Sequence, residues 1–304
     1  MKEKEILSFW PITFDSPGPE ERITGSPNRT EERFLFRDEE GIFYIAEGYS
    51  ISKQSFQIRQ NLLLEFLAEN LLGGIHPFYR TLSGEHGAEV NGLFWQIRPY
   101  IPAETLPRES LGQKEEYGLL WGNFLLEMKE KIRETSDPPP MPNAPFYMGD
   151  FLPRLEALAE RKMPSVRKEL DHYTRLLSPF LKWERKADGF FAHGDFHPGN
   201  ILVRDGEIKA VIDWEFAGVK FPGYDMALLT GCLGMDDPAN LSGNAVKSLQ
   251  NLLYTHNYLP EDAWDILPQM IAGTRMGWLG EWLNMEEVSL VRQELTLLSI
   301  LLEE

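Results

Sequence analysis

The sequence contains little cysteine and no long hydrophobic run. Cys232 is the only cysteine in 304 residues, which excludes an intramolecular disulfide and a zinc site built from several cysteines. The longest apolar stretches, such as Leu297 to Leu302, are far shorter than the roughly 20 residues of a membrane-spanning helix. Residues 1–14 mix acidic with basic groups and are interrupted by Pro11, unlike a signal peptide. The sequence therefore predicts a soluble protein of the reducing cytoplasm, with no membrane partner.

Positive charge is also scarce. The 30 lysines and arginines face 47 aspartates and glutamates, so the net charge is -17. A surface of this sign repels a phosphate backbone, and this argues against nucleic acid as a partner. It is compatible with a cationic small-molecule substrate, although plain solubility is the commoner reason for an acidic surface. The length predicts about two domains, and the sequence does not specify an oligomeric state.

The first hundred residues alternate between strand and helix patterns. A hairpin begins at Arg33, turns at Gly41 and continues into the apolar run Ile42 to Ala46. Residues 54–72 predict a helix whose apolar positions recur at helical spacing, and residues 93–100 predict a buried strand. The segment "IPAETLP", with two prolines, is typical of a linker, so we expect the first domain to cover residues 1–101.

The remainder, residues 102–304, is mainly helical in pattern. Helices are predicted at Leu111 to Arg133, Asp150 to Lys162 and Ser165 to Leu181, and again over most of the chain from Asp225 to the end. The two parts together predict an α+β protein with a small β-rich N-terminal lobe and a larger, mostly helical C-terminal lobe.

One stretch of this second part is unusually polar for its position. It reads "FFAHGDFHPGN", from Phe190 to Asn200, and is followed by "ILVRDGEIKAVIDWEFAG". Asp205-Gly206 is a strong signal for a two-residue hairpin turn, which requires positive φ at both positions. Such a hairpin returns Asp213 to the segment that holds Asp195 and Asn200.

Two carboxylates and an asparagine brought together in this way suit phosphoryl transfer. One carboxylate orients and deprotonates a hydroxyl, while a carboxylate and an amide oxygen hold magnesium on the phosphates. The alternating residues His193, Asp195 and His197 also fit the ligand set of a metal hydrolase. That alternative leaves Asn200 and the hairpin without a role.

These residues resemble a known family. "HGDFHPGN" followed by "VIDWEFAG" is similar to the signature of the aminoglycoside phosphotransferase and choline kinase family, whose members are related to the protein kinases. The resemblance extends to "PYIPAETL", which is similar to the hinge between the family's two lobes, and to "PGYDMA", where the family keeps a buried aspartate. It implies a two-lobed protein-kinase-like fold that binds nucleotide between the lobes.

The resemblance also implies roles for single residues. Asp195 corresponds to the catalytic base, and Asn200 and Asp213 correspond to the ligands of Mg²⁺. His197 lies where kinases place a group near the transferred phosphate, so it joins Asp195 as a candidate catalytic residue. Two further residues support the loop in this comparison: His193 through hydrogen bonds of its side chain, and Asp225 by accepting hydrogen bonds from the loop backbone.

The cofactor implied is ATP or GTP with Mg²⁺. In the hinge, the backbone near Pro99, Tyr100 and Ile101 would bond the adenine ring. Any residue type supplies a backbone amide and carbonyl, so the sequence cannot test this.

The first lobe departs from the family pattern. The strand that normally carries the phosphate-binding lysine reads "IFYIAEGY", with Ala46 and Glu47 at the expected position, and the helix that normally supplies its partner glutamate has Gln60. Glu65 and Glu69 lie one and two turns later. Candidate replacements for the cation are Lys53, Arg37 and Arg59. Gly25 in "ITGSPN" is a weak candidate for a phosphate-binding loop.

Two functions therefore stay open. The first is a small-molecule O-phosphotransferase that moves the γ-phosphate to a substrate hydroxyl. The second is a catalytically weak or inactive nucleotide-binding relative that has lost the lysine. An aromatic and acidic set would suit a cationic substrate, although aromatics at helical spacing are more often core residues. The members of this set are Trp214, Glu215, Trp264, Trp278, Glu281 and Trp282.

Overall fold

The computed structural model describes residues 2–19, 30–70, 73–104, 106, 108–135 and 140–303. The chain divides into two compact units. The first comprises Met1–Glu104, Thr135–Pro142 and Leu202–Ile212, and the second comprises Thr105–Glu134, Asn143–Ile201 and Asp213–Glu304. The assignment of a nucleotide-binding role to residues 1–101 and a catalytic role to residues 102–304 stays a prediction.

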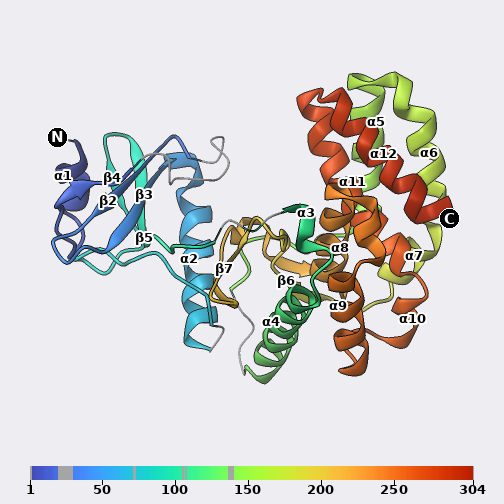
Figure 1. The fold of residues 1–304 in the computed structure, drawn as a ribbon. Helices are drawn as coiled ribbons and strands as arrows, with labels where there is room; N and C mark the ends of the chain where they lie inside the picture. The colour runs from blue at the N-terminus through green and yellow to red at the C-terminus, as the bar shows by residue number, and fades with distance from the viewer. Residues whose placement is uncertain are drawn as a thin grey trace. The chain divides into compact units, whose positions relative to one another are not determined.

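The first unit is built on an antiparallel sheet with the strand order β1-β2-β3-β5-β4, drawn in blue to green in Figure 1. Its elements are α1 (Lys2–Leu7), β1 (Ser16–Pro17), β2 (Glu32–Arg37), β3 (Phe43–Ser50), a 3-10 turn (Ile51–Lys53), α2 (Gln54–Glu69), β4 (Ala88–Val90) and β5 (Leu93–Pro99). The predicted hairpin, helix and strand are confirmed here. The helix, predicted to reach residue 72, is described as far as Glu69, and Gly25 lies outside the described residues.

One face of this sheet is apolar. Alternate residues of a strand point to opposite faces, so Tyr44 and Ala46 share a face with Trp95 and Ile97 of the neighbouring strand β5. The helix α1 covers this face with Ile6 and other apolar side chains, all of them buried. The opposite face consequently carries Ile45, Glu47, Gln96 and Arg98.

The hairpin predicted at Asp205-Gly206 is present. β7 (Ile201–Arg204) and β8 (Glu207–Val211) form a two-stranded sheet. Asp205 has φ 56° and Gly206 has φ 74°, the positive values that the predicted turn requires. The hairpin joins the first unit through main-chain bonds, in which Val211 N–H donates to Gly74 O at 2.9 Å and Glu104 N–H donates to Val203 O at 2.9 Å.

The second unit is mainly helical, as predicted (Figure 1). Its helices are α3 (Arg108–Leu111), α4 (Glu115–Glu134), α5 (Met148–Lys162), α6 (Arg167–Leu176), α7 (Ser178–Glu184), α8 (Tyr224–Asp236), α9 (Asn244–Thr255), α10 (Glu261–Trp264), α11 (Leu267–Met285) and α12 (Val288–Glu303), with 3-10 turns at Pro164–Val166, Trp214–Phe216 and Pro238–Ser242. The short strands β6 (Phe190–Ala192) and β9 (Gly218–Lys220) pair antiparallel. The helix predicted for residues 165–181 is divided in two, with Pro179 in the first turn of α7, where a missing N–H is tolerated.

Close helix packing shapes the core of this unit. α4 lies against α9, and a Cβ at Gly118 would lie 1.9 Å from the carbonyl oxygen of Ala245, so glycine is required at this contact. The inner face of α4 buries Trp121, Leu125 and Met128. α11 packs against α5, α8 and α12, and this arrangement makes α11 buried on most of its circumference.

Candidate active site

A buried aspartate anchors the polar loop that follows β6. The backbone amides of His193 and Gly194 donate to the two carboxylate oxygens of Asp225, at 2.8 and 2.9 Å. Asp225 lies in the first turn of α8 and is 1% exposed. Its predicted role as an acceptor for the loop backbone is confirmed. Burial raises the pKa of Asp225 to about 6, and the two amides oppose this rise.

A buried lysine lies beneath the same loop. Lys220, at the end of β9, is 8% exposed, and its ammonium group lies 5.0 Å from the ring centroid of Tyr224 and 5.3 Å from that of Phe146. Burial lowers its pKa to about 8, while the charges of Asp225 and Asp195 act in the opposite direction. The sequence analysis did not identify Lys220, because nothing in the local pattern distinguishes a buried lysine from an exposed one.

The loop brings three predicted site residues together. Asn200 donates from Nδ2 to both the carbonyl oxygen and Oδ2 of Asp195, each at 2.9 Å. His197 Nε2 lies 3.7 Å from Asp195 Oδ2. Asp195 is 5% exposed, and the hydrogen bond from Asn200 holds its carboxylate in one position. The amide N–H of Asp195 donates to His193 Nδ1 at 3.1 Å, which confirms the predicted supporting role of His193.

Asp213 begins a turn that packs on the loop. It has φ 63° and ψ 53°, a left-handed conformation, and precedes the 3-10 turn Trp214–Phe216. The Trp214 ring contacts the His193 ring at 4.4 Å between centroids. At Gly194, whose φ is +87°, a Cβ would lie 2.2 Å from the carbonyl oxygen of Phe216. Only glycine permits this approach, so the order "HGD" brings the two segments into contact.

The donor set of this region suits a hard divalent cation. The Asn200 side chain has an amide oxygen beside the nitrogen that donates to Asp195, and Asp213 has a carboxylate. Mg²⁺ prefers such oxygens and completes its shell with water and phosphate. Within the described ranges, no group of three or more His, Cys, Asp or Glu side chains forms a site for a metal ion. An amide oxygen and a carboxylate fit the magnesium that the resemblance implies.

The residues predicted to bind nucleotide lie in the first unit. Tyr100 donates its amide N–H to Phe43 O at 2.9 Å, which extends the β3–β5 ladder, so this amide is not available to an adenine ring. Ile101 follows immediately. Lys53 is exposed at the end of the 3-10 turn that leads into α2.

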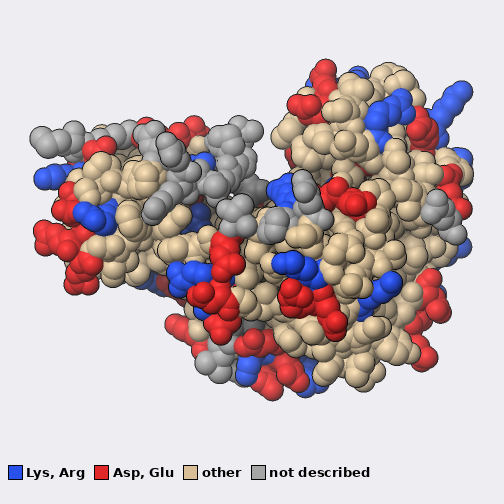
Figure 2. Space-filling model, viewed as in Figure 1, with Lys and Arg blue, Asp and Glu red and all other residues tan. Residues whose placement is uncertain are grey.

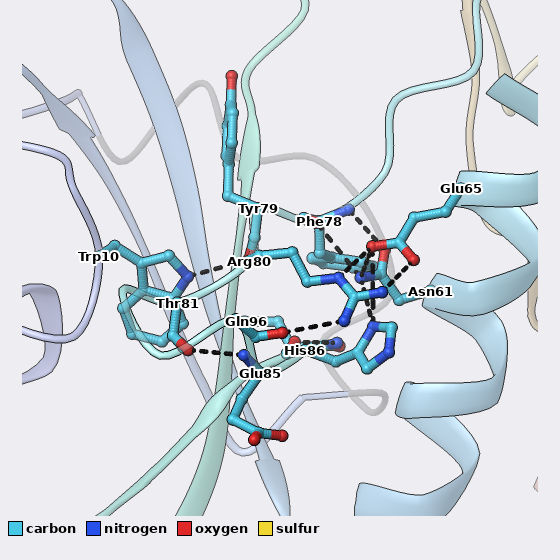
Figure 3. Close-up of polar contacts among 11 residues, drawn as sticks. Trp10, Asn61, Glu65, Phe78, Tyr79, Arg80, Thr81, Glu85, His86 and Gln96 are labelled. Carbon is cyan, nitrogen blue, oxygen red and sulfur yellow. Dashed lines mark hydrogen bonds and ion pairs between the residues drawn. The ribbon is translucent and has the colours of Figure 1, made fainter. Parts of the chain in front are cut away.

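Figure 3 shows the polar contacts of Glu65, a glutamate of α2. Glu65 receives two hydrogen bonds from Arg80, both of 2.6 Å, and is thereby neutralised by this arginine. Asn61, fully buried on the same helix, exchanges hydrogen bonds with the backbone of Phe78 and contacts His86. These hydrogen bonds hold α2 against the segment before β4. Gln60 of the same helix is buried and uncharged.

Glu47, where the sequence analysis expected the lysine, forms an ion pair. Glu47 of β3 receives hydrogen bonds from Arg98 of β5, from Nε at 2.9 Å and from Nη2 at 3.3 Å. Of the cations that the sequence analysis considered, Arg37 pairs with Asp15 at the surface, and Arg59 and Lys53 are exposed. The sequence analysis missed Arg98 because its proximity to Glu47, which lies 51 residues earlier in the chain, depends on the register of β3 and β5.

The aromatic residues named as a candidate substrate pocket separate into different surroundings. Trp214 is 1% exposed against His193 and Phe191, and Trp264 packs on Tyr254. Trp278 and Trp282 stack on each other at 5.4 Å, and the ring of Trp278 lies 6.2 Å from that of His197. The last two are partly exposed, and Trp278 contacts the predicted catalytic loop from a different element than Trp214 does.

The sequence matches the model of a protein family described as "Phosphotransferase enzyme family" over residues 30–257, which is most of the chain. The chain belongs to this family. The match covers the loop with Asp195 and the turn with Asp213, as well as the strands with Glu47 and Arg98. A search among curated proteins finds no match.

Several solved structures share the fold of this chain. Amicoumacin kinase hAmiN, in complex with AMP-PNP, Ca²⁺ and Ami, has a TM-score of 0.72 at 16% identity, and the match covers 98% of this chain and 92% of that one. An aminoglycoside phosphotransferase from Alicyclobacillus acidocaldarius has a TM-score of 0.60 at 15% identity, over 98% and 94% of the two chains. The GDP complex of aminoglycoside 2'-phosphotransferase-IIIa has a TM-score of 0.64 at 14% identity, over 98% and 97%. The predicted protein-kinase-like fold is confirmed.

The described part of the chain contains no helix with the length and apolar character required to cross a membrane. Acidic side chains are spread over the face drawn in Figure 2, with lysines and arginines between them, in agreement with the net charge of -17.

Proposed function

We propose that this protein is a small-molecule kinase that transfers the γ-phosphate of ATP or GTP to a substrate hydroxyl with Mg²⁺. The observation that carries the proposal is the closed loop in which Asn200 holds Asp195 by two hydrogen bonds while Asp225 anchors the loop backbone. The family match and the nucleotide-bound solved structures support the reaction class.

In this proposal Asp195 is the catalytic base. Asn200 donates to its Oδ2 and so positions the carboxylate that receives the proton of the substrate hydroxyl. Because phosphoryl transfer depends mainly on positioning and on charge stabilisation, a carboxylate fixed in one rotamer serves the reaction better than a mobile one. His197, 3.7 Å from the same oxygen, donates to the transferred phosphate.

Asn200 and Asp213 hold the magnesium, which neutralises charge on the phosphates when bound. The adenine ring bonds to the backbone at Tyr100 and Ile101. Since the Tyr100 amide is used by Phe43, the Ile101 amide is the donor and the preceding carbonyls are the acceptors. Lys53 remains a candidate for contact with the outer phosphates. We place the enzyme in the cytoplasm, where ATP is abundant and Cys232 stays reduced.

Substrate identity is proposed only as a class. The solved structures name aminoglycosides and amicoumacin as ligands of those proteins. Trp278 contacts His197 and offers an aromatic surface to a protonated amine. Glu281, which is exposed and directly precedes Trp282, offers a negative charge. A hydroxyl compound that carries an amine is therefore the first class to test.

The test measures phosphate transfer from labelled ATP with Mg²⁺ to a panel of aminoglycosides, amicoumacin, choline and amino alcohols. We expect Asp195→Asn to lower kcat by about 10³-fold while the melting temperature changes little, because loss of a positioned base has this magnitude. Asp205→Asn, in the exposed hairpin turn, is the matched control and should retain full activity. Retention of more than a tenth of the wild-type rate in Asp195→Asn would contradict the proposal.

One observation favours a second function. The expected lysine position holds Glu47, and a kinase relative that lost this lysine can retain nucleotide binding with little transfer. Tight binding of ATP by the wild-type protein, with no turnover on any substrate of the panel, would support this alternative.

A further inference from the structure

The ion pair between Arg98 and Glu47 arises from the register of the first sheet. β3 and β5 are antiparallel, with Ile45 opposite Arg98 and Glu47 opposite Gln96. Arg98 and Glu47 are thus diagonal neighbours on one face, at a separation that long side chains span. The two hydrogen bonds, of 2.9 and 3.3 Å, join two nitrogens of the guanidinium to the two carboxylate oxygens in a bidentate pair.

The pair has a buried end and an accessible end. The side chain of Glu47 is 9% exposed and receives a further hydrogen bond from Tyr49 Oη at 3.3 Å. The side chain of Arg98 is 21% exposed, with its guanidinium 6.0 Å from the centroid of the Phe78 ring. The carboxylate is therefore the more buried partner, and the guanidinium is the more accessible one.

The helix α2 has uncharged or neutralised side chains where the resemblance implies a glutamate. Gln57 and Gln60 of α2 are buried and uncharged, and Glu65 is neutralised by Arg80. In protein kinases the cation that contacts the nucleotide phosphates is a strand lysine held by a glutamate from a helix. Here a carboxylate stands at the position of the lysine, and a cation from the adjacent strand holds it.

We propose that Arg98 is the phosphate-binding cation of this protein and that Glu47 orients it. The inference rests on the proposed kinase function and names the residue that replaces the missing lysine. The ion pair joins two strands of one sheet, so it forms with the sheet and does not depend on the position of α2. A guanidinium carries five N–H donors in a planar fork, so it can hold a carboxylate and still bond phosphate oxygens.

The test compares nucleotides that differ only in phosphate. Dissociation constants of ATP, ADP, AMP and adenosine are measured by calorimetry for the wild type, Arg98→Gln and Arg98→Lys. We expect Arg98→Gln to raise the dissociation constant of ATP by at least about tenfold, because the loss of a hydrogen bond to a charged group weakens binding by about this factor. The dissociation constant of adenosine should change by less than about twofold. The ATP dissociation constant of Arg98→Lys should lie between those of the wild type and Arg98→Gln, because lysine keeps the positive charge and lacks the planar fork of donors.

Two further variants control for misfolding. Arg80→Gln breaks the other bidentate arginine–glutamate pair of this unit and should leave all four dissociation constants unchanged. Glu47→Gln with Arg98→Gln leaves no lone buried carboxylate, so it should fold and show the same loss of ATP affinity as Arg98→Gln alone.

The outcomes separate this inference from the proposed function. Suppose that the wild type binds ATP and transfers phosphate. The inference is then wrong, and the proposed function stands, if Arg98→Gln binds ATP with the wild-type affinity. The same holds if Arg98→Gln loses affinity for ATP and for adenosine by the same factor. If the wild type binds none of the nucleotides, both are wrong.

Discussion

Both units contain an arginine–glutamate pair in a buried setting, and the two pairs differ in what surrounds them. In the second unit Arg275 of α11 binds Glu294 of α12, and the side chains are 3% and 0% exposed. In the first unit the side chains of Arg98 and Glu47 are 21% and 9% exposed. The closed pair has its remaining polar atoms occupied by the protein: Trp282 donates to Glu294 at 3.1 Å, and Arg275 donates to the Cys232 sulfur at 3.3 Å.

The comparison separates a fully buried ion pair from one whose cation is partly exposed. A pair sealed in a helical core stabilises the fold only while both partners remain, because each charge alone is costly to bury. Burial also raises the pKa of the Cys232 thiol to about 11, so this thiol stays protonated at neutral pH. A pair with an accessible cation is suited to a second anion. The predictions that follow test how much each buried charge contributes to stability.

The largest effect is expected for Arg275→Leu. Loss of the arginine leaves Glu294 buried and uncompensated, so the free energy of unfolding should fall by about 4 kcal/mol in urea denaturation. Arg292→Leu is the control in the neighbouring helix, where the pair with Glu169 is exposed on both sides and contributes less than about 1 kcal/mol. Equal losses in the two variants would show that burial does not distinguish them.

Asp225→Ala should have the next largest effect. Two buried backbone amides, those of His193 and Gly194, lose their acceptor, and this should lower the free energy of unfolding by about 3 kcal/mol. Asp237→Ala is the control: this carboxylate caps an exposed turn by accepting from Ala239, and its loss should cost about 1 kcal/mol. A cost for Asp225→Ala as small as that of the control would contradict the anchoring role.

Lys220→Met tests a buried charge whose ammonium group lies near the rings of Phe146 and Tyr224. Burial lowers the folded pKa to about 8, whereas the unfolded lysine titrates at about 10.4. Between these values the unfolded chain binds the proton and the folded chain does not, so stability rises with pH. From pH 8 to 9.5 we expect the free energy of unfolding of the wild type to increase by about 1.5 kcal/mol relative to Lys220→Met. Parallel curves for the two proteins would show that the lysine keeps an ordinary pKa.

The smallest effect is expected for Arg80→Gln. Its pair with Glu65 has two short hydrogen bonds, but the arginine side chain is 44% exposed. Solvent screens such a pair, so the free energy of unfolding should change by about 0.5 kcal/mol in urea denaturation at low salt. A loss above about 2 kcal/mol would mean that short hydrogen bonds, rather than burial, determine the value of an ion pair here.

The elements that local pattern specifies could be predicted from the sequence. The turn at Asp205-Gly206 follows from the tolerance of these residues for positive φ, and the strands on either side follow from their β-branched and apolar residues. The division of residues 165–181 into α6 and α7 was not predicted, because apolar periodicity continues across the break while the backbone changes direction near Pro179. Arg98 and Lys220 were missed, since each owes its environment to segments far away in the chain.

The sequence by itself determined the polar loop after β6 and the family. His193, Asp195 and Asn200 lie within eight consecutive residues, so short-range backbone geometry suffices to bring their polar atoms together. Only the tertiary structure decided how buried charges are compensated. The partner of Glu47 depends on strand register, and the environment of Lys220 depends on which rings pack around it. Burial and pairing are properties of the assembled core, where the cost of an isolated charge selects partners that sequence proximity does not reveal.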